Sequence, residues 1–553
     1  MRALPVLSTA SLAVVLACNP SGSGSPGKAD GEACSTAAEC RSGLCFRAPG
    51  AAAAACASSE PAAAGECPPP GAQIITAGPA IDAPQPTSCQ TPVRAPATNA
   101  GDIAFIDLGE AKVGDTLRFT LPSGTTSFSI VSQAVATPTV PGGTRPPSTI
   151  AFQSFSIPNS VVPTSVVHVP TGTQYYSDTE ALPRIGPYLD ATSVLAYYGG
   201  LSPISGAFTV PNTSKALDVA LTAGELPSGE WSFVVNDFAF ECLSVQGCFA
   251  PAGSNTSAYH VQVLVEQRPF TSTGALDVEV YLATSPASEL RTASAAASDP
   301  QFQRWARSYA SYLAKAGICV RNVTVHDLPS WVVGGTGYAP NGLLDVSGGG
   351  QGTPPGCDDL SQLFTLGLAQ NRAVHLFMAD ALVAQTLGGF TVLGVDGSIP
   401  GPSGVPGTIN GGAVVGVTGF LGGERTAGAC SAGGAPNVVV CGTDALALVS
   451  AHETGHWLGL YHTTEFDGTL FDPLTDTASC PCLQCAPFAL RSRCAERNPT
   501  GQPTFMLGSY CTGQRPRCGG ARNLMFWLFD DRFAIGDTSR QQGDVMRRNP
   551  AVR

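Results

Sequence analysis

One short stretch constrains this 553-residue chain more than any other feature: residues 452–462 read HETGHWLGLYH. On a helix, His452 and His456 lie four residues apart and project from one face. Two corners of a tetrahedral metal site accept that spacing. Glu453 is turned about 100° around the helix axis, which places its carboxylate beside the metal rather than on it. The pattern predicts two imidazole ligands and an adjacent general base.

Gly459 and His462 extend the pattern to a third ligand. Glycine can adopt the left-handed conformation that ends a helix, so the chain can turn sharply and bring His462 back to the same point. Three protein nitrogens leave a fourth position open for water, the arrangement of a catalytic rather than a structural zinc site. The sequence therefore predicts one catalytic Zn²⁺. A chance match on an exposed helix is the alternative, and the extended spacing disfavours it.

The residues before the motif support a helix. Thr443 is a candidate N-cap, and Asp444 in the first turn favours the positive end of the helix dipole. No proline interrupts the sequence from Thr443 to Leu458. We therefore expect one continuous helix to carry the first two histidines and Glu453.

The extended motif resembles the zinc signature of the metzincin metalloproteases, whose other mark is a methionine in a tight turn beneath the metal. Met525, in Asn523-Leu524-Met525, is the candidate. Within the metzincins the chain is most similar to the pappalysins. The similarity is dense over residues 444–477, thinner over 523–548, and confined to the C-terminal part. It implies a zinc endopeptidase that binds an extended peptide along the strand upstream of the helix.

The mechanism implied by this resemblance uses zinc to acidify a bound water, while Glu453 takes the proton and passes it to the leaving amine. Trp527 is a departure from the pattern, because pappalysins usually carry a tyrosine there that can stabilise the reaction intermediate. Tryptophan offers an indole N–H donor but no phenol. The departure concerns oxyanion stabilisation and not zinc binding.

Acidic residues flank this region on both sides of the turn methionine. Oxygen-rich loops can hold calcium, and pappalysins use this region for it, although the spacing is not that of an EF-hand and a solvated acidic loop is the alternative. The candidate Ca²⁺ ligands are Asp467, Asp472 and Asp476. Asp530 and Asp531 stand where an acidic residue of a pappalysin relative lines the pocket after the scissile bond. They imply a preference for Arg or Lys near the cleavage site.

The N-terminal residues indicate export. Residues 1–17 carry one positive charge and an apolar run too short to span a bilayer, which is typical of a signal peptide. Residues 15–18 then resemble a bacterial lipobox with Cys18 as the lipidated residue; an ordinary secreted protein is the alternative. Removing Cys18 from the nineteen cysteines leaves an even number that can pair as disulfides. We expect a lipoprotein of the bacterial cell surface or outer membrane, or a secreted protein, that touches the membrane only through its anchor.

The chain divides into further segments by composition. Residues 18–98 read as a Cys-rich segment and an Ala/Pro-rich linker, in which Cys89 is a candidate for a pro-segment cysteine that masks the zinc. Residues 99–270 show short alternating apolar runs and no convincing amphipathic helix, which predicts an all-β sandwich of the jelly-roll type. Residues 271–553 show the order strand, helix, strand and then the zinc helix, which suits an α/β metzincin catalytic domain. The predicted fold is thus multidomain.

Other functions stay open beside the protease hypothesis. The net charge of −12 argues against nucleic acid as a partner, so the expected partner is a protein or peptide substrate. One alternative is a zinc-binding pseudo-protease or adhesion lipoprotein whose β-domain binds a surface ligand; the intact Glu453 argues against it and Trp527 keeps it open. A metal-dependent hydrolase acting on substrates other than peptides is the second alternative.

Overall fold

The structure is a computed structural model of the whole chain. It describes residues 45–46, 55–56, 79–81, 89, 103–112, 114–134, 156–177, 205–244, 247–249, 258–288, 290–334, 337–346, 359–367, 372–383, 391–397, 399–401, 411–418, 420, 442–468, 471–494, 504–515, 517–530 and 535–553. The predicted signal peptide and Cys18 lie outside these residues. Within them, no helix is long and apolar enough to cross a membrane.

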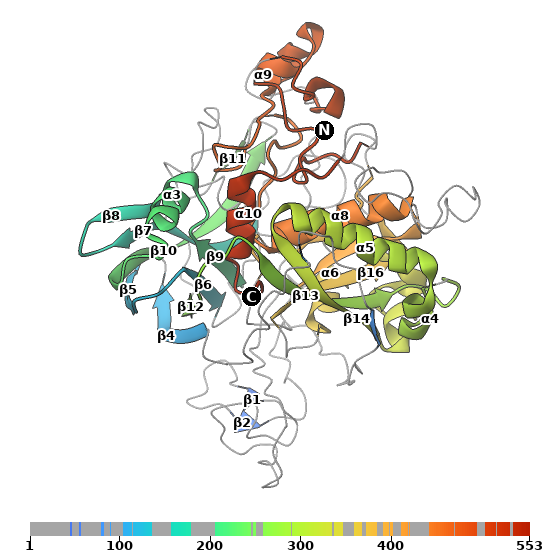
Figure 1. Ribbon diagram of the computed structural model, residues 1–553, viewed down its shortest axis with the longest axis horizontal. Coiled ribbons are helices and arrows are strands. Elements are labelled where there is room, and N and C mark those ends of the chain that lie inside the picture. The colour runs from blue at the N-terminus through green and yellow to red at the C-terminus, as the bar shows by residue number, and fades with distance from the viewer. Residues whose placement is uncertain are drawn as a thin grey trace.

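The protein is a mixed α/β structure with several sheets, most of their strands antiparallel (Figure 1). A six-stranded sheet lies in the half that carries the zinc motif, in the order β18-β19-β16-β13-β14-β3. Its four inner strands are parallel, and both edge strands run antiparallel to their neighbours. The strands are β3 (Ala80–Ile81), β13 (Gly274–Ala283), β14 (Ile318–Asp327), β16 (Ala373–Ala379), β18 (Gly394–Asp396) and β19 (Ala413–Gly416).

Two helices, α5 (Pro300–Lys315) and α8 (Gly442–Trp457), cover one face of this sheet. The helix predicted between the first two strands of this part is present as α5, with Asp299 as its N-cap and Pro300 as its first residue. Its buried aromatic side chains meet α8: Trp305 Nε1 donates to Ser450 Oγ at 3.1 Å. The hydroxyls of Tyr309 and Thr454 share a 2.8 Å hydrogen bond. The helix α8 is therefore held on a buried helical layer.

The opposite face of the sheet has its own buried cluster, built on Tyr281, Phe364 and Phe377. Short elements close this side: α6 (Asp359–Thr365), β15 (Leu343–Asp345) and β17 (Ala381–Val383), the last two pairing in parallel. These two strands have three residues each and are not predicted from the sequence. Short two- to four-residue strands are too brief to show a period.

The described strands between residues 103 and 266 form two antiparallel sheets, on the left of Figure 1. One has the order β4-β12-β6-β9; the other has β11-β10-β7-β8, with β5 also paired to β10. Rings from the two sheets meet edge to face, with Phe128 and Trp231 centroids 5.2 Å apart. The strands are β4 (Ile103–Lys112), β5 (Thr116–Leu121), β6 (Ser127–Ala134), β7 (Ser156–His168), β8 (Thr173–Ser177), β9 (Ser205–Val210), β10 (Gly229–Ser244), β11 (Gly247–Phe249) and β12 (Ala258–Glu266).

The expectation of no helix in this region is wrong, because α3 spans Ser214–Ala223. Thr213 caps it by accepting a hydrogen bond from the Ala216 N–H. Its buried face consists mainly of small residues, namely Ser214, Ala216, Leu217 and Ala220. Small side chains give a weak apolar stripe, so the 3.6-residue period is hard to see in the sequence.

The C-terminal helix α10 (Arg540–Arg547) lies between the antiparallel sheets and the six-stranded sheet (Figure 1). Ser214 Oγ donates to Gln541 Oε1 at 2.7 Å, and the Thr475 N–H donates to the same Ser214 hydroxyl at 2.8 Å. A second contact is a buried carboxylate: Glu266 pairs with Arg268 at 2.5 Å and Arg372 at 3.2 Å. Buried polar contacts therefore join the two parts.

An N-terminal segment is clipped to the edge of the six-stranded sheet. Cys89 forms a disulfide with Cys319 in β14, and β3 pairs with the same strand. The candidate role of Cys89 as a zinc-masking thiol is wrong, because a disulfide sulfur is not a thiolate ligand. The remaining short elements are β1 (Cys45–Phe46), β2 (Ala55–Cys56), α4 (Ala293–Ser298), η3 (Ser330–Val333), η4 (Pro340–Gly342), α9 (Cys482–Cys485), η5 (Phe488–Arg493) and η6 (Gly508–Tyr510).

His375, buried in β16, makes the fold sensitive to acid. Burial lowers its pKa to about 4, against about 6.5 in an unfolded chain. The folded state therefore favours the neutral ring. The neutral ring therefore contributes up to about 3 kcal/mol to the free energy of unfolding. This contribution is fully present above pH ~6.5 and is lost as the pH falls towards 4. As the pH falls from about 6.5 to 4, the free energy of unfolding should decrease less in His375→Gln than in the parent. Denaturant titrations at several pH values measure this difference. An equal loss in both proteins would contradict this assignment.

Candidate metal centre

The helix α8 begins at Gly442, one residue before the predicted N-cap. Thr443 therefore lies inside the helix, and its hydroxyl donates to Gln301 Oε1 at 3.0 Å instead of capping. Asp444 does more than face the helix dipole: it accepts from Arg304 Nη2 at 2.7 Å and from Ser308 Oγ at 2.6 Å. These buried bonds fix the rotation of α8 on α5 and so the direction in which its histidines project.

Three histidine nitrogens converge at one point beside α8. The Nε2 atoms of His452 and His456 lie 3.1 Å apart, and each lies 3.1 to 3.2 Å from Nε2 of His462. Ligands about 2.05 Å from a tetrahedral zinc lie about 3.3 Å from one another, so the spacing suits a zinc ion. Among the described residues, this is the only group of three or more His, Cys, Asp or Glu side chains gathered closely enough to hold a metal.

The second nitrogen of each ring is bound to an oxygen acceptor. His452 Nδ1 donates to the Leu524 carbonyl at 2.6 Å, and His456 Nδ1 donates to the Leu460 carbonyl at 2.7 Å. His462 Nδ1 donates to Glu465 Oε1 at 2.8 Å. Because Nδ1 carries the proton in each neutral ring, all three Nε2 lone pairs face one another. Three converging lone pairs favour a cation between them, and a ligand histidine is usually held in this way.

Burial keeps the first two rings in the form that binds metal. It lowers the pKa of His452 to about 3 and that of His456 well below its usual value, and in both cases the nearby His462 adds to the effect. Both imidazoles are therefore neutral at pH 7 without any need for a metal to displace a proton. The residues present fit a zinc ion.

The turn that returns His462 is the predicted one. Gly459 has a φ of 109°, a conformation that side-chain-bearing residues rarely adopt. The Gly459 N–H donates to the His456 carbonyl at 2.8 Å, and the Leu460 N–H donates to the Gly455 carbonyl at 2.9 Å. These bonds end the helix and reverse the chain within three residues of the third histidine.

A tight turn carries Met525 beneath the helix, as the sequence predicts. The Phe526 N–H donates to the Asn523 carbonyl at 3.2 Å, and the Asn523 side chain accepts from the Met525 N–H at 2.8 Å. Met525 is fully buried, and a Cβ added at Gly455 would lie 2.5 Å from its sulfur. The turn also supplies the carbonyl that orients His452, so it supports the centre directly.

Glu453 lies next to the triad and is almost fully buried. Burial raises the pKa of its carboxyl to about 8. A carboxyl that titrates near neutral pH can both take and give a proton, which suits a general base that later acts as an acid. The edge strand β18 passes close to it, since a Cβ added at Gly394 would lie 2.5 Å from Glu453 Oε1.

Glu465 is a site residue that the sequence interpretation places only within an acidic loop. The structure shows it buried, with its carboxylate on the His462 ring. A carboxylate in this position fixes the ring and raises the basicity of the ligand nitrogen. Its position three residues after the third histidine is the signal that could have identified it.

The three candidate calcium ligands, Asp467, Asp472 and Asp476, do not converge on one point. Asp476 caps α10, accepting from Ser539 Oγ at 2.7 Å and from the Gln541 N–H at 2.9 Å. Asp472 accepts from the Thr477 hydroxyl at 2.6 Å, and burial raises its pKa to about 8. Asp467 is buried. Within the described part of the chain these carboxylates do not form a metal-binding cluster.

The only polar atom of the Trp527 side chain, the indole nitrogen, makes a structural hydrogen bond. Its indole N–H donates to the Met506 carbonyl at 2.8 Å, and its ring lies against Phe505 with centroids 6.1 Å apart. The indole therefore ties the turn to the preceding Cys-rich loop and is not directed to a reaction intermediate. Asp530 is half-buried; Asp531 lies outside the described residues.

Comparison with known proteins gives no match: no family model, no curated protein and no solved structure is similar to this chain at a significant level. The chemistry of the site therefore rests on its own geometry. That geometry offers three nitrogen ligands, one buried carboxyl and an adjacent sheet edge.

Gly394→Ala is expected to lower turnover by roughly 100-fold, because the added Cβ displaces the Glu453 carboxylate by about an ångström. Bound zinc should stay unchanged, since no ligand is touched. Gly416→Ala in the neighbouring strand is the matched control, because its Cβ would lie no closer than 3.5 Å to any atom. Equal activity of both variants in a peptide-cleavage assay would contradict this placement of Glu453.

Proposed function

We propose that the protein is a zinc-dependent endopeptidase of the metzincin type, with Glu453 as the general base. The observation that carries the proposal is the convergence of three Nε2 lone pairs within 3.2 Å, each ring being fixed through its Nδ1 proton. The extended motif, the turn at Gly459 and the buried Met525 beneath the helix support the same conclusion.

His452, His456 and His462 would hold the zinc ion, with nitrogen donors that suit this metal. When bound, zinc supplies a Lewis acid that polarises a carbonyl and makes a water more acidic near neutral pH. Three protein ligands leave room for a water and a substrate group.

Glu453 transfers a proton from the attacking water to the leaving group. Its buried carboxylate takes a proton from the attacking water and delivers it to the nitrogen of the leaving amine, so the carboxyl returns to its starting state. Burial raises the pKa of this carboxyl to about 8 in the metal-free site, and the positive charge of a bound ion would favour the carboxylate form that accepts the proton. No metal ligand has to change its protonation state in this cycle.

The edge strand β18 is the proposed binding surface for the substrate. Within the described residues it pairs only with β19, so its other edge can accept an extended peptide as an added strand. Gly394 at its start lies against Glu453. A peptide bound along this edge would therefore pass beside the general base.

The proposal extends to the architecture and location of the protein. The two antiparallel sheets of residues 103–266 would form an accessory β-sandwich, and the residues from 271 onward the catalytic domain. Edge-to-face aromatic contacts between the two sheets support the first assignment. Four disulfides among the described residues support an exported protein, whose anchor would be Cys18.

A zinc-binding pseudo-protease is the second candidate, and Trp527 is the observation that favours it. Its indole N–H is committed to the Met506 carbonyl, so it is not the oxyanion donor that a tyrosine could supply. In this case the centre would bind zinc without cleaving peptides.

The test is cleavage of casein and of small esters and amides by the purified full chain, before and after treatment with a zinc chelator. We expect cleavage of casein that the chelator abolishes and added zinc restores. Bound zinc without any hydrolysis would favour the pseudo-protease. Hydrolysis of small substrates with none of casein would favour a non-peptide hydrolase.

A further inference from the structure

The described part of the loop between the third histidine and the turn methionine forms a distinct lobe, which we call the Cys-rich lobe (residues 480–494, 504–515 and 517–522). Three disulfides fix it, Cys480–Cys511, Cys482–Cys494 and Cys485–Cys518. It carries α9 and projects at the top of Figure 1, at the opposite end from β1 and β2. Three disulfides in so short a segment make it rigid.

The lobe has a charge opposite to that of the whole protein. Residues 480–522 contain six arginines and a single acidic residue, in a chain whose net charge is −12. Four described arginines are exposed: Arg493, Arg515, Arg517 and Arg522. Within the described residues, none of these four forms an ion pair with a carboxylate. Such a concentration of unpaired positive charge attracts an anionic partner.

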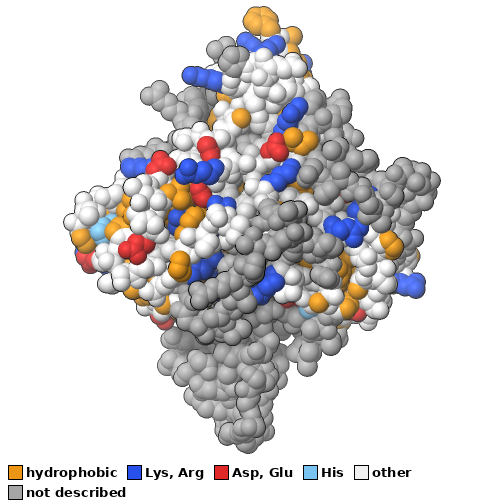
Figure 2. Space-filling view, viewed as in Figure 1, with side chains coloured by type: hydrophobic (Ala, Val, Ile, Leu, Met, Phe, Trp, Pro, Cys, Tyr) orange, Lys and Arg blue, Asp and Glu red, His pale blue; other side chains and the backbone are white. Residues whose placement is uncertain are grey.

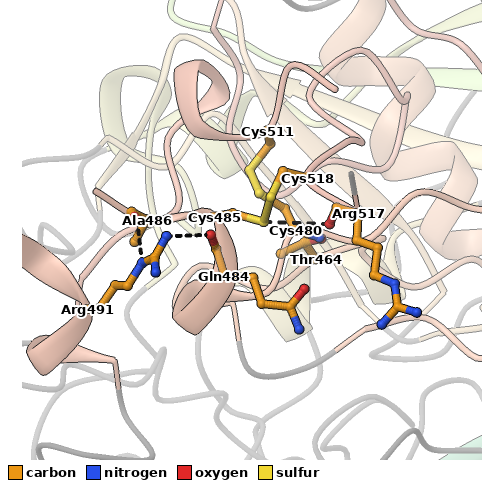
Figure 3. The surroundings of a disulfide bond; sticks show 9 residues. All are labelled: Thr464, Cys480, Gln484, Cys485, Ala486, Arg491, Cys511, Arg517 and Cys518. Atoms are coloured by element: carbon orange, nitrogen blue, oxygen red, sulfur yellow. Dashed lines mark hydrogen bonds between the residues drawn. A yellow bond between two sulfur atoms is a disulfide. The ribbon is translucent and has the colours of Figure 1, made fainter. Parts of the chain in front are cut away.

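A fifth arginine is held in place by the lobe itself. Arg491 donates through Nε to the Ala486 carbonyl at 3.0 Å and through Nη2 to the Gln484 carbonyl at 2.8 Å (Figure 3). Figure 3 also shows the Cys485–Cys518 disulfide between the segments that carry Arg491 and Arg517. The disulfide therefore joins the two cationic segments into one surface.

A large apolar side chain stands among these charges. Phe488 is 89% exposed, more than any other large hydrophobic side chain in the described residues, and it begins η5, which also carries Arg491 and Arg493. Figure 2 shows hydrophobic side chains at the tip of the lobe with basic ones close behind. An aromatic anchor beside arginines is typical of a protein-recognition surface.

The lobe is also fixed relative to the metal centre. At its base, the Cys480 N–H donates to Thr464 Oγ1 at 2.9 Å, two residues after the third histidine. On the other side, the Trp527 indole binds the Met506 carbonyl at 2.8 Å. A ligand bound to the lobe is thus held at a constant distance from the histidines.

We propose that the Cys-rich lobe is a second substrate-binding surface, which takes an acidic segment of the polypeptide that is cleaved at the metal centre. The inference rests on the proposed endopeptidase function. An anionic membrane is the rival partner, but a single exposed phenylalanine gives little apolar area for insertion. The rigid link to the metal centre favours a partner that occupies both places at once.

Binding is the first measurement, because it does not depend on catalysis. The full chain carrying Glu453→Gln would be titrated with a fluorescent peptide of ten alternating Asp and Glu residues, followed by anisotropy. Arg493→Glu/Arg515→Glu, at two exposed positions, should weaken binding about tenfold or more, and added salt should do the same. Arg291→Glu, at an exposed arginine outside the lobe, is the control and should bind as the parent does.

Cleavage is the second measurement. A short peptide cleaved by the parent would be compared with the same peptide carrying a flexible linker and an acidic tail. In the parent, the acidic tail should lower KM and so raise kcat/KM. In Arg493→Glu/Arg515→Glu the tail should have no such effect. The parent and this variant should cleave the untailed peptide equally. Equal tail effects in both proteins would overturn the inference. So would binding to vesicles of phosphatidylcholine and phosphatidylglycerol with no binding to the acidic peptide. Failure of the proposed function itself would appear separately, as no cleavage of any peptide.

Discussion

Replacing Glu453 by glutamine is expected to lower peptide-bond hydrolysis by about 100- to 10,000-fold, the usual contribution of a positioned general base. Glutamine keeps the shape of the side chain and the burial of the site, but it cannot take the proton from the attacking water. Zinc content should match that of the parent, because the three ligands are the histidines and their Nδ1 partners are unchanged. Initial rates on a casein-derived peptide, measured beside metal analysis of both proteins, test this directly.

Glu465→Gln is the matched comparison for this prediction. Its carboxylate contacts the His462 ring rather than the substrate, so its loss should weaken zinc affinity by about 10- to 100-fold. With saturating zinc, activity should return largely to the parental level. If Glu453→Gln also recovered with added zinc, Glu453 would be a support for the metal and not the base.

Replacing Asp444 by alanine is expected to destabilise the fold by about 3 to 5 kcal/mol, the range for removing one partner of a buried ion pair. Both side chains are buried, Arg304 at 4% and Asp444 at 0% exposure. The substitution leaves the guanidinium buried without its counter-ion and also removes the acceptor of Ser308 Oγ. Chemical denaturation, with the midpoint and slope compared to the parent, measures the loss.

Two controls separate the charge effect from general damage. Arg304→Met/Asp444→Leu removes both charges and should cost much less than Asp444→Ala alone, because no unpaired charge remains. Glu230→Ala removes an exposed pair with Arg118 and should change the free energy of unfolding by less than about 1 kcal/mol. A loss in Asp444→Ala no larger than in Glu230→Ala would show that the buried pair does not hold α8 on α5.

The zinc motif and its immediate frame could be predicted from the sequence because their signals are local. Spacing along one helix placed His452 and His456, and a glycine at the helix end placed the turn to His462. The turn of Met525 beneath the helix followed from resemblance and is present in the structure. Several strands of residues 99–270 followed from the alternation of apolar residues, as in β5.

The features that could not be predicted from the sequence depend on contacts between segments that are far apart in the chain. The Asp444 pair joins residues 140 positions apart, so an acidic residue in a first helical turn was read only as a dipole partner. The Cys89–Cys319 disulfide spans 230 positions, and cysteine pairing has no local signal. Trp527 was an exception to a family pattern in the sequence, and only its bond to Met506 shows what the indole does instead.

The most direct measurement is zinc K-edge X-ray absorption on the purified full chain, with metal content determined on the same sample. One zinc per chain is expected, with three imidazole nitrogens at about 2.0 to 2.1 Å and a further light ligand. His456→Gln should lose that signal. A folded parent that binds no zinc, or one whose zinc has sulfur ligands, would contradict the assignment of these three histidines as the metal centre.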